Sequence, residues 1–464
     1  MNYDDRWSVL LTDKRFRTLG QRNPLDKRNP FEDDYSRLIS SPPIRRLQDK
    51  TQVFPLEKSD FIRTRLTHSL EVSFIAKSIG KSVEEALIEK KILNPELRGY
   101  MSSLLFTAGL VHDLGNPPFG HFGETAIQDF FKAHFKDETI REKFSPQEIA
   151  DFENFDGNVQ AFRILRKLHF LKDENSYNLT YPTLSAIIKY PRSSISGNKK
   201  DKRTHINEKK SGYFITEQED YNKIDTFLNL NGNRHPVTYL LEAADDIAYS
   251  AADIEDGVKL GILNFDKIKE VFETHLDKKN AIYAQLLKEL EDTHQELKNT
   301  GLGRLDITIQ RFRITTQSLM IIAVVDEFLK NYEDFMNESY NEEILDRFEH
   351  KSVREAYKGL MKIVLDDKKI IQTELAGYKV LTGLLEEYIP ACSMSDFSLS
   401  GKNTKARRLY YTISSTYRFI YETYSASSNV NPLYCKYQLV TDILSGMTDH
   451  YALNLYQNIK GISL

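Results

Sequence analysis

The chain of 464 residues is poor in cysteine: it has only Cys392 and Cys435, and they form no CxxC pair. Two isolated cysteines exclude a disulfide framework and a cysteine-based zinc cluster, and they suit a reducing cytosol. No apolar run approaches the roughly 20 residues that a membrane helix requires. The N-terminal stretch is charged throughout and lacks a signal-peptide core. We therefore expect a cytoplasmic protein with no membrane partner.

The chain also lacks an excess of charge of one sign. Its formal net charge is −4 at pH 7, so no global basic field argues for a nucleic-acid partner. Three catalytic motifs are missing as well, namely GxxxxGK[ST], GxSxG and HExxH. The glycines of LGNPPFG are interrupted by two prolines, which favours a turn over a dinucleotide-binding loop. These absences exclude ordinary P-loop chemistry, the nucleophile elbow and the zincin site.

Helical periodicity covers most of the long segments. Apolar residues recur at helical intervals over Leu66–Glu89. Met101–Leu114 is almost entirely apolar and predicts a buried helix, which should end at the Gly-Asn-Pro-Pro stop before a new helix begins near His121. We expect further helices over Tyr239–Leu260, Phe265–Asn299 and Ile309–Tyr332, a turn at Gly301–Gly303, and a short strand near Gly212–Thr216. The pattern predicts a mainly α-helical fold.

Four residues in three separate runs offer metal ligands: His68, the adjacent His112 and Asp113, and Asp245. Imidazole and carboxylate donors suit an octahedral divalent ion such as Mn²⁺, Mg²⁺ or Fe²⁺ better than a thiolate zinc site. An unpaired ionised Asp113 after an apolar helix would be costly, and a metal would satisfy it.

Helical spacing selects Asp245 as the aspartate of the third run. Asp245, Tyr249 and Asp253 lie at i, i+4 and i+8 and share one helix face, whereas Asp246 points elsewhere. On the residues alone, two other interpretations stay open: His68 as a structural histidine, and the aspartates as a solvated acidic face.

His121 and Glu124 follow the two prolines at a spacing of i, i+3. A carboxylate that orients an imidazole and raises its basicity is a suitable pair for proton transfer. The alternative is a capping histidine with a first-turn glutamate that the helix dipole stabilises.

Several ordered motifs give the chain a resemblance to a known family. The motifs are RRLQDKTQVFP (Arg45–Pro55), RTRLTHSLEV (Arg63–Val72), HDLGNPPFGHFGE (His112–Glu124), FENFDGNVQAFRIL (Phe152–Leu165), IIKYP (Ile187–Pro191), KKSGYF (Lys209–Phe214), EAADDIAYSAAD (Glu242–Asp253) and GMTDHYAL (Gly446–Leu453). Over most of its length the chain resembles the bacterial deoxyguanosine triphosphate triphosphohydrolases (dGTPases) of the HD-domain metal phosphohydrolase superfamily. The resemblance implies one large protein over residues 1–464: an HD-domain helical bundle with additional helices and a few short strands, a metal-site core at about 60–260 and a helical C-terminal part at about 261–464.

The resemblance also implies a reaction. One divalent metal per subunit, most simply Mn²⁺ or Mg²⁺, would be held by His68, His112, Asp113 and Asp245, with His121 and Glu124 as the catalytic pair. The implied reaction converts dGTP to deoxyguanosine and inorganic triphosphate by attack at the α-phosphorus. A water near His121 would be the nucleophile, or His121 would assist the departing 5′-oxygen; the sequence does not separate these roles.

A triphosphate adds more negative charge than one divalent ion cancels, so the pocket must supply cations. Lysine side chains and one arginine are the candidates, together with amides and hydroxyls that would contact phosphate, sugar or base. The predicted substrate-binding residues are Gln52, Arg65, Asn154, Asn158, Lys189, Tyr190, Lys210, Tyr249 and Asp253. Gln52 resembles the glutamine that reads the base edge in this family, and an amide that both donates and accepts can match guanine.

The polar, basic stretch Ser193–Gly212 predicts a loop, either a solvated surface loop or a mobile lid whose lysines meet phosphates. Two rival functions remain. One is a broader dNTP triphosphohydrolase or another HD-domain nucleotidase. The other is a non-catalytic regulator that binds a nucleotide or single-stranded DNA, for which the basic run Lys199–Lys210 is the local support. The family resemblance further implies a homo-oligomer, often a hexamer.

Overall fold

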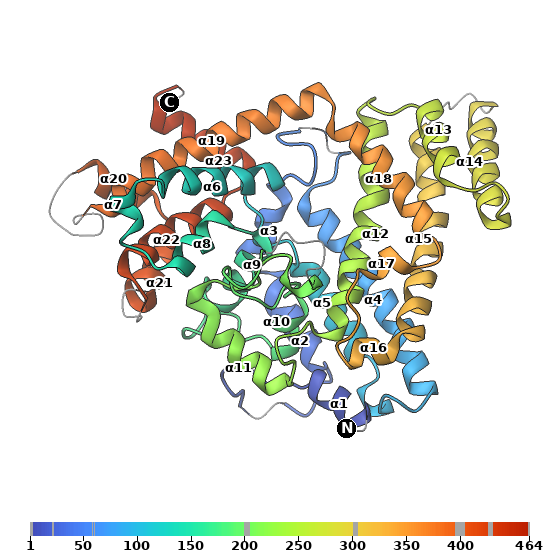
Figure 1. The fold of residues 1–464 in the computed structure, drawn as a ribbon, viewed down its shortest axis with the longest axis horizontal. Coiled ribbons are helices and arrows are strands. Elements are labelled where there is room, and N and C mark those ends of the chain that lie inside the picture. Colours follow the sequence, from blue (N-terminus) through green and yellow to red (C-terminus); the bar gives the residue numbers. More distant parts are fainter. Residues whose placement is uncertain are drawn as a thin grey trace.

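The computed structural model describes residues 3–20, 23–57, 59, 61–198, 205–299, 305–394, 404–425 and 430–462. Within these ranges the regular structure is helical (Figure 1), and no β-strand occurs apart from two isolated bridges, Arg15–Thr180 and Thr51–Thr64. The predicted mainly α-helical fold is confirmed. The expected turn at Gly301–Gly303 lies outside the described residues.

The short strand expected near Gly212–Thr216 is wrong. The chain there is irregular and then forms a 3-10 turn, Ile215–Glu217. The Ile215 amide donates to the Asp151 carboxylate at 2.9 Å, so it is not available to a neighbouring strand.

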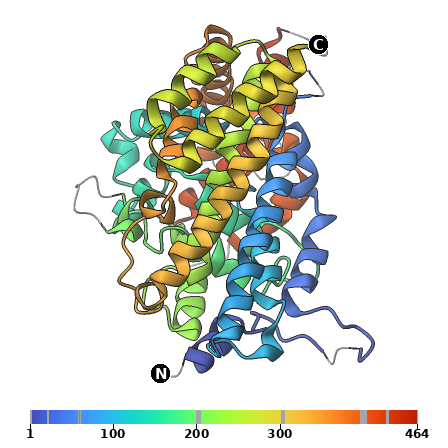
Figure 2. The same cartoon turned by 90° about the vertical axis from the view of Figure 1, so that its right-hand side faces the viewer.

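A central bundle carries the candidate metal ligands. Its helices are α4 (Arg65–Glu89), α5 (Tyr100–Val111), α12 (Pro236–Lys259), α15 (Leu305–Lys330) and α18 (Lys351–Leu365). Helix α12 packs against the other four, and α4 packs against α5. The turned view shows α15 between α14 (Ala281–Asn299) and α4 on one face of the molecule (Figure 2).

Helices α4 and α5 approach each other closely because small residues line their contact. A Cβ at Gly109 would lie 2.6 Å from the Ser73 Cα, and a Cβ at Gly80 would lie 2.6 Å from Leu105. The Ser73 hydroxyl also donates to the Phe106 carbonyl at 2.5 Å. This close crossing fixes the distance between the His68 end of α4 and the His112 end of α5.

The single helix expected over Phe265–Asn299 is instead two helices, α13 (Phe265–His275) and α14. Between them, the Asp277 side chain accepts the Lys279 amide and the Asn280 side chain accepts the Ile282 amide, each at 2.9 Å. Side chains that bond their own backbone compete with continuous helix, and here they end one helix and start the next.

The remaining helices cover the bundle and form a second lobe. The N-terminal and connecting helices are α1 (Tyr3–Leu10), α2 (Pro30–Ile39), α3 (Pro42–Arg46), α7 (Glu138–Arg141), α8 (Pro146–Glu153), α9 (Gly157–Arg166), α10 (Tyr181–Ala186), α11 (Gln218–Leu228), α16 (Tyr332–Met336) and α17 (Ile344–Arg347). The second lobe contains α6 (Gly120–His134), α19 (Lys368–Ser393), α20 (Lys405–Thr412), α21 (Ser415–Ile420), α22 (Pro432–Gly446) and α23 (Asp449–Lys460).

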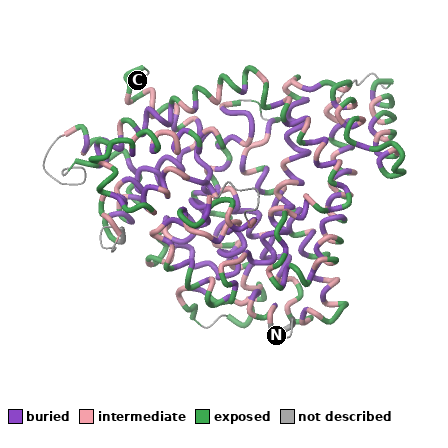
Figure 3. The backbone as a smooth tube through the Cα atoms, in the orientation of Figure 1, coloured by how far each residue is buried: buried purple, intermediate pink, exposed green. Residues whose placement is uncertain are grey.

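Buried residues gather in two apolar clusters. Figure 3, which is coloured by burial, shows buried positions of the chain in the interior of both lobes. The first cluster extends in sequence from Trp7 to Ile370 and surrounds α4, α5 and α12. The second extends from Phe119 to Ala452 and lies between α6, α19 and α22 of the second lobe and the connecting helix α8. The HD motif ends in the first cluster and the His121 helix starts in the second, so the chain between His112 and His121 passes from one core to the other.

No helix in the described part of the chain is both long enough and apolar enough to span a membrane.

Candidate metal centre and catalytic site

Three of the four predicted metal ligands converge. Ligand atoms of His68, His112 and Asp245 all lie within 4.8 Å of one another. One carboxylate oxygen of Asp245 is 3.1 Å from His68 Nε2 and 3.3 Å from His112 Nε2. The second ring nitrogen of His112, Nδ1, is 2.8 Å from the Gly109 carbonyl oxygen. A carbonyl only accepts, so Nδ1 carries the proton and Nε2 keeps the lone pair that a metal would take.

The electrostatics of this cluster favour charged carboxylates. Burial alone would raise the pKa of Asp245, but His112 and Lys189 hold that pKa well below its usual range. Burial opposes protonation of His112, yet the Asp113 and Asp245 carboxylates outweigh burial and raise the pKa of the imidazole. The cluster is therefore a place where positive charge is stabilised, whether a proton or a metal ion supplies it.

Asp113, the fourth predicted ligand, lies beside the cluster and already has partners. One of its oxygens is 3.6 Å from His112 Nε2 and accepts the Asn116 amide at 2.6 Å. The other accepts a guanidinium N–H of Arg65 at 2.5 Å. Burial would raise the pKa of Asp113, but Arg65 and His112 more than offset it and the pKa ends well below its usual value. Asp113 is thus ionised and oriented, with Arg65 beside it.

The neighbouring aspartates of α12 face in different directions. Asp245 faces the two histidines, whereas Asp246 accepts a hydrogen bond from Arg354 Nε of α18 at 2.6 Å. The Lys189 ammonium is 3.3 Å from the second oxygen of Asp245. The structure therefore places Asp245 at the cluster and gives Asp246 a packing role between two helices.

The His121–Glu124 pair forms at the start of α6. His121 Nδ1 is 3.1 Å from one oxygen of Glu124, and the other oxygen accepts the Gly157 amide at 2.7 Å. The Glu124 contact is the largest influence on His121 and raises the pKa of its imidazole. The imidazole follows the Phe119–Gly120 turn, which has φ values of 64° and 62°, and it is exposed to solvent. The pair is intact, and its base is accessible.

The same turn lies next to the metal cluster. A Cβ at Gly120 would be 3.5 Å from Nη2 of Arg65 and 3.8 Å from the Gln52 carbonyl oxygen. Since Arg65 also holds Asp113, it connects the His121 turn to the candidate ligands.

Two predicted cations lie around this region. Burial works against the charge of Lys189, but Asp245 and Glu242 raise its pKa above the usual value. Lys210 donates to Asp156 at 2.6 Å, and although burial lowers its pKa, Asp156 and Glu124 bring it to about 12. Both lysines are therefore protonated at neutral pH. Residues 199–204, the middle of the predicted basic loop, lie outside the described residues.

Three predicted substrate residues carry buried polar atoms without a hydrogen-bond partner in the described structure: Gln52 Oε1, Arg65 Nε and Asp253 Oδ2. A buried polar atom normally has a partner, and each of these three atoms could therefore bond a polar ligand. Tyr249 lies between Asp245 and Asp253 on α12, and burial, followed by the charge of Asp253, raises its pKa. These residues fit a polar ligand beside the α12 face.

The remaining predicted residues have local roles in the structure. The Asn154 amide bonds the Ala150 carbonyl at 3.0 Å, back onto its own helix. The Asn158 amide bonds Asp156 at 2.9 Å, next to Lys210. The ring of Tyr190 lies 5.2 Å from the Arg234 guanidinium. None of these three contacts a metal-cluster residue through an identified hydrogen bond among the described residues, so their substrate roles stay predictions.

Comparison with known proteins decides the family. Residues 65–221 match the HD domain model. The chain is 40% identical to a protein of Listeria innocua and to one of Listeria monocytogenes, each named deoxyguanosinetriphosphate triphosphohydrolase-like protein, over 99% of this chain and 100% of each relative. A protein of Synechocystis with the same name is 33% identical over the same shares. The chain belongs to this deoxyguanosinetriphosphate triphosphohydrolase-like family. It is an HD-domain, metal-dependent phosphohydrolase.

The residues present fit the divalent ion that an HD-domain phosphohydrolase uses. Two imidazole nitrogens and the Asp245 carboxylate form a mixed N/O donor set at suitable separations. The Gly109 carbonyl bonds the other ring nitrogen of His112 and so fixes the orientation of a ligating histidine. The donor set does not distinguish Mn²⁺ from Mg²⁺.

Sequence reasoning missed the residues that support this HD-domain site. Asn116 orients Asp113, Arg354 holds Asp246, and Lys50 donates to the Asn116 carbonyl at 2.7 Å. Asn116 lies inside the HDLGN run and Lys50 inside RRLQDKTQVFP, but neither motif indicates a role for these two residues. Nothing in the sequence near Arg354 indicates its role.

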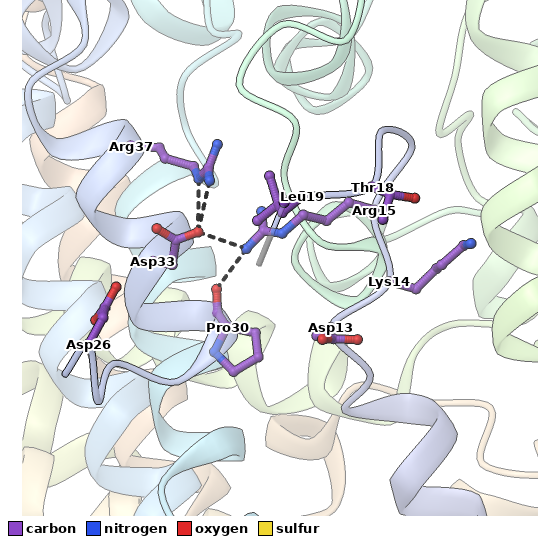
Figure 4. A pocket seen from close by; sticks show the side chains of 10 residues that line it. Asp13, Lys14, Arg15, Thr18, Leu19, Asp26, Pro30, Asp33 and Arg37 are labelled. Atoms are coloured by element: carbon purple, nitrogen blue, oxygen red, sulfur yellow. Dashed lines mark hydrogen bonds and ion pairs between the residues drawn. The ribbon is translucent and has the colours of Figure 1, made fainter. Parts of the chain in front are cut away.

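A separate cavity of about 390 Å³ lies near the N-terminus (Figure 4). Its charged residues are Asp13, Lys14, Arg15, Asp26, Asp33 and Arg37. Arg15 and Arg37 both pair with Asp33, at 3.2 and 2.9 Å, so the charges of the cavity largely compensate one another (Figure 4). None of the predicted site residues lines it.

Proposed function

We propose that the protein hydrolyses dGTP to deoxyguanosine and inorganic triphosphate. The observation that carries the proposal is the convergence of His68, His112 and Asp245 beside an intact His121–Glu124 pair. The names of the full-length relatives support the choice of dGTP. When bound, a divalent ion would supply Lewis acidity toward phosphate oxygens.

The chain's own residues would divide the remaining work. Lys189, Lys210 and Arg65 would balance the charge of the triphosphate, because all three are cationic and the two lysines keep raised pKa values. Their present partners, Asp245, Asp156 and Asp113, are the carboxylates that hold them in place in the described structure.

His121 would handle the proton. In the proposed reaction the oxygen of water bonds to the α-phosphorus, the bond from that phosphorus to the 5′-oxygen breaks, and the 5′-oxygen takes a proton. An imidazole whose pKa is raised by Glu124 holds its proton closer to neutral pH, which suits delivery to the leaving oxygen. The same imidazole in its neutral form can instead accept the proton of the attacking water and then pass it to the 5′-oxygen. In the first role, the proton lost by the water restores the imidazolium.

Gln52 and Tyr249 would select the substrate. The unpartnered Gln52 Oε1 can accept a hydrogen bond from a guanine edge. Tyr249 follows Asp245 by one helical turn, so its ring would lie near the sugar and exclude a ribose hydroxyl by contact. A site that bonds guanine should reject adenine strongly, because buried polar groups would then lose their partners.

The test is a competition among dGTP, dATP, dCTP, dTTP and GTP in the presence of Mn²⁺, with identification of every product. We expect dGTP to be consumed first and triphosphate to be released. Equal rates on the four deoxynucleotides would remove the guanine preference and leave a broader dNTP triphosphohydrolase. Release of pyrophosphate or single phosphate would overturn the reaction itself.

The assembly and nucleic-acid predictions stay open to experiment. The homo-oligomer, a hexamer by family resemblance, is tested by light scattering. Binding of single-stranded DNA is tested by titration with a labelled oligonucleotide, and binding without any triphosphate release would favour the regulator.

A further inference from the structure

The C-terminal GMTDHYAL motif has no part in the proposed reaction, yet one of its residues contacts two segments that border the site. Asp449 is the first residue of α23, and only 2% of it is exposed. One oxygen of its carboxylate accepts the Phe119 amide at 3.1 Å. The other accepts the Thr51 amide at 3.1 Å and also the Thr51 hydroxyl. A single carboxylate therefore joins two segments that are far apart in sequence.

Both of these segments border the candidate site. Thr51 precedes Gln52, the predicted base-contacting residue. Phe119 is the left-handed residue, with φ of 64°, at which the chain turns into α6 two residues before His121. A non-glycine residue in this conformation is strained and persists only when its surroundings hold it. The hydrogen bond from the Phe119 amide to Asp449 stabilises this conformation.

Neighbouring contacts join the same three segments. Lys50 is buried and donates to the Asn116 carbonyl at 2.7 Å and to the Ser445 carbonyl at 2.5 Å. At the exposed edge of the contact, His450 Nδ1 is 2.7 Å from Asp49. Consecutive residues 49–51 thus each contact the end of α22 or the start of α23, and two of the three contacts also involve the 116–119 turn.

We propose that Asp449 is a positioning residue that fixes the Gln52 segment and the His121 turn relative to each other. The proposal rests on the proposed function, in which Gln52 contacts the base and His121 moves the proton. Because one carboxylate holds both segments, the distance between the residue that contacts the base and the residue that moves the proton is fixed. Loss of the carboxylate should then affect selectivity and turnover together.

Asp449→Asn is a sharp test because of hydrogen-bond chemistry. The aspartate has two accepting oxygens, and each takes a backbone N–H from a different segment. Asparagine has one accepting oxygen, and its NH₂ group would face a donor. The variant must release either Thr51 or Phe119 while nearly keeping the volume of the side chain.

The first readout is independent of activity. Amide hydrogen exchange of wild type and Asp449→Asn is compared over residues 49–54 and 116–121. We expect exchange at Thr51 or Phe119 to become at least about tenfold faster, the usual consequence of losing a hydrogen bond to a charged group. His450→Ala is the matched control: it removes the contact between Asp49 and the start of α23 but leaves the Asp449 bonds, so both amides should exchange as in wild type.

The second readout is kinetic. We expect Asp449→Asn to lower kcat by roughly 10-fold to 100-fold and to narrow the preference for dGTP over dATP, with Mn²⁺ affinity unchanged. His450→Ala should keep wild-type turnover and selectivity. Loss of thermal stability with unchanged kcat and selectivity in the folded fraction would make Asp449 merely structural and would overturn the proposal. Unchanged exchange at both amides would overturn it as well.

Two further outcomes need their own interpretation: a wild type that releases no triphosphate, and an Asp449→Asn variant that does not fold. If wild type releases no triphosphate, the proposed function fails, while exchange in Asp449→Asn still decides whether this carboxylate holds the two segments. If Asp449→Asn does not fold, Thr51→Val carries the test. It removes only the hydroxyl donor, so we expect exchange at residue 51 to rise roughly threefold and dGTP preference to weaken; no change in either would contradict the proposal.

Discussion

His68, His112 and Asp245 come from α4, the end of α5 and α12, and 177 positions separate His68 from Asp245. His121 and Glu124 are three positions apart within the first turn of one helix. The two histidine side chains of the first group are 2% and 3% exposed, whereas that of His121 is 84% exposed. The first group depends on tight helix packing, which buries both imidazoles. The second depends on a local turn and meets solvent.

The contrast fits the chemistry proposed for each group. Ligands for one ion need fixed spacing, which the close α4–α5 crossing provides. A proton-transfer group needs access to water and to a leaving oxygen. Substitutions in the first group should therefore change metal binding, and substitutions in the second should change rate alone.

The largest expected effect is that of Asp245→Ala. It removes the carboxylate nearest both histidines, so Mn²⁺ affinity should fall by more than about 100-fold and hydrolysis should disappear. Loss of a group that only orients a ligand typically costs less than that. Calorimetric Mn²⁺ titration measures it. Asp246→Ala is the control: it breaks the Arg354 bond and costs stability, yet should keep the metal. If Asp246→Ala empties the site and Asp245→Ala does not, the assignment of the helix face is wrong.

His121→Ala should lower kcat by roughly 10²–10⁴-fold, the range for general acid–base catalysis, with Mn²⁺ affinity close to wild type. Because the side chain is exposed, thermal stability should change little. Thr125→Ala, one turn along the same helix, removes an exposed hydroxyl that bonds the His121 carbonyl and should keep turnover. Wild-type turnover in His121→Ala would leave His121 as a helix cap and remove the contrast in chemistry.

The preference for dGTP should depend on Gln52 and Tyr249, which belong to neither group. Gln52→Ala should reduce the dGTP preference by about tenfold, the effect of one lost hydrogen bond, while affecting the maximal rate less. Tyr249→Ala should raise the relative rate on GTP, and Tyr249→Phe, which keeps the ring, should not. Competition assays measure both. A Tyr249→Phe variant that accepts GTP as well as Tyr249→Ala does would assign the discrimination to the hydroxyl instead of the ring.

The smallest expected effect is a shift in the pH dependence of kcat in Glu124→Gln. The Glu124 contact is the main reason that the pKa of His121 lies above its ordinary value, so its loss should lower that pKa. Protonated His121 would then persist only at lower pH, and the limb of the kcat profile that His121 controls should shift in the same direction. NMR titration of the labelled imidazole measures the change. An unchanged or higher pKa would show that other neighbours set it.

Most of the helices could be predicted from the sequence because their signals are local. The apolar run before Gly115 fixes α5, and the stop at Pro117 and Pro118 fixes the start of α6. The spacing of Asp245, Tyr249 and Asp253 placed them on one face of α12. The prediction of elements failed at residues 276–280 and at Gly212–Thr216. There, side chains that hydrogen-bond the backbone decide the local structure, and hydrophobic periodicity does not indicate such bonds.

By itself, the sequence determined the mainly helical fold, the His121–Glu124 spacing and the residue types that offer metal ligands, since each follows from neighbours within a few turns. Only the tertiary structure decided that His68 and His112 face one oxygen of Asp245, that Asp113 is held by Arg65 and Asn116, and that Asp449 joins Thr51 to Phe119. The physical reason is that these contacts depend on how helices from distant parts of the chain pack, through small residues such as Gly80 and Gly109 and through buried hydrogen bonds that no local pattern encodes.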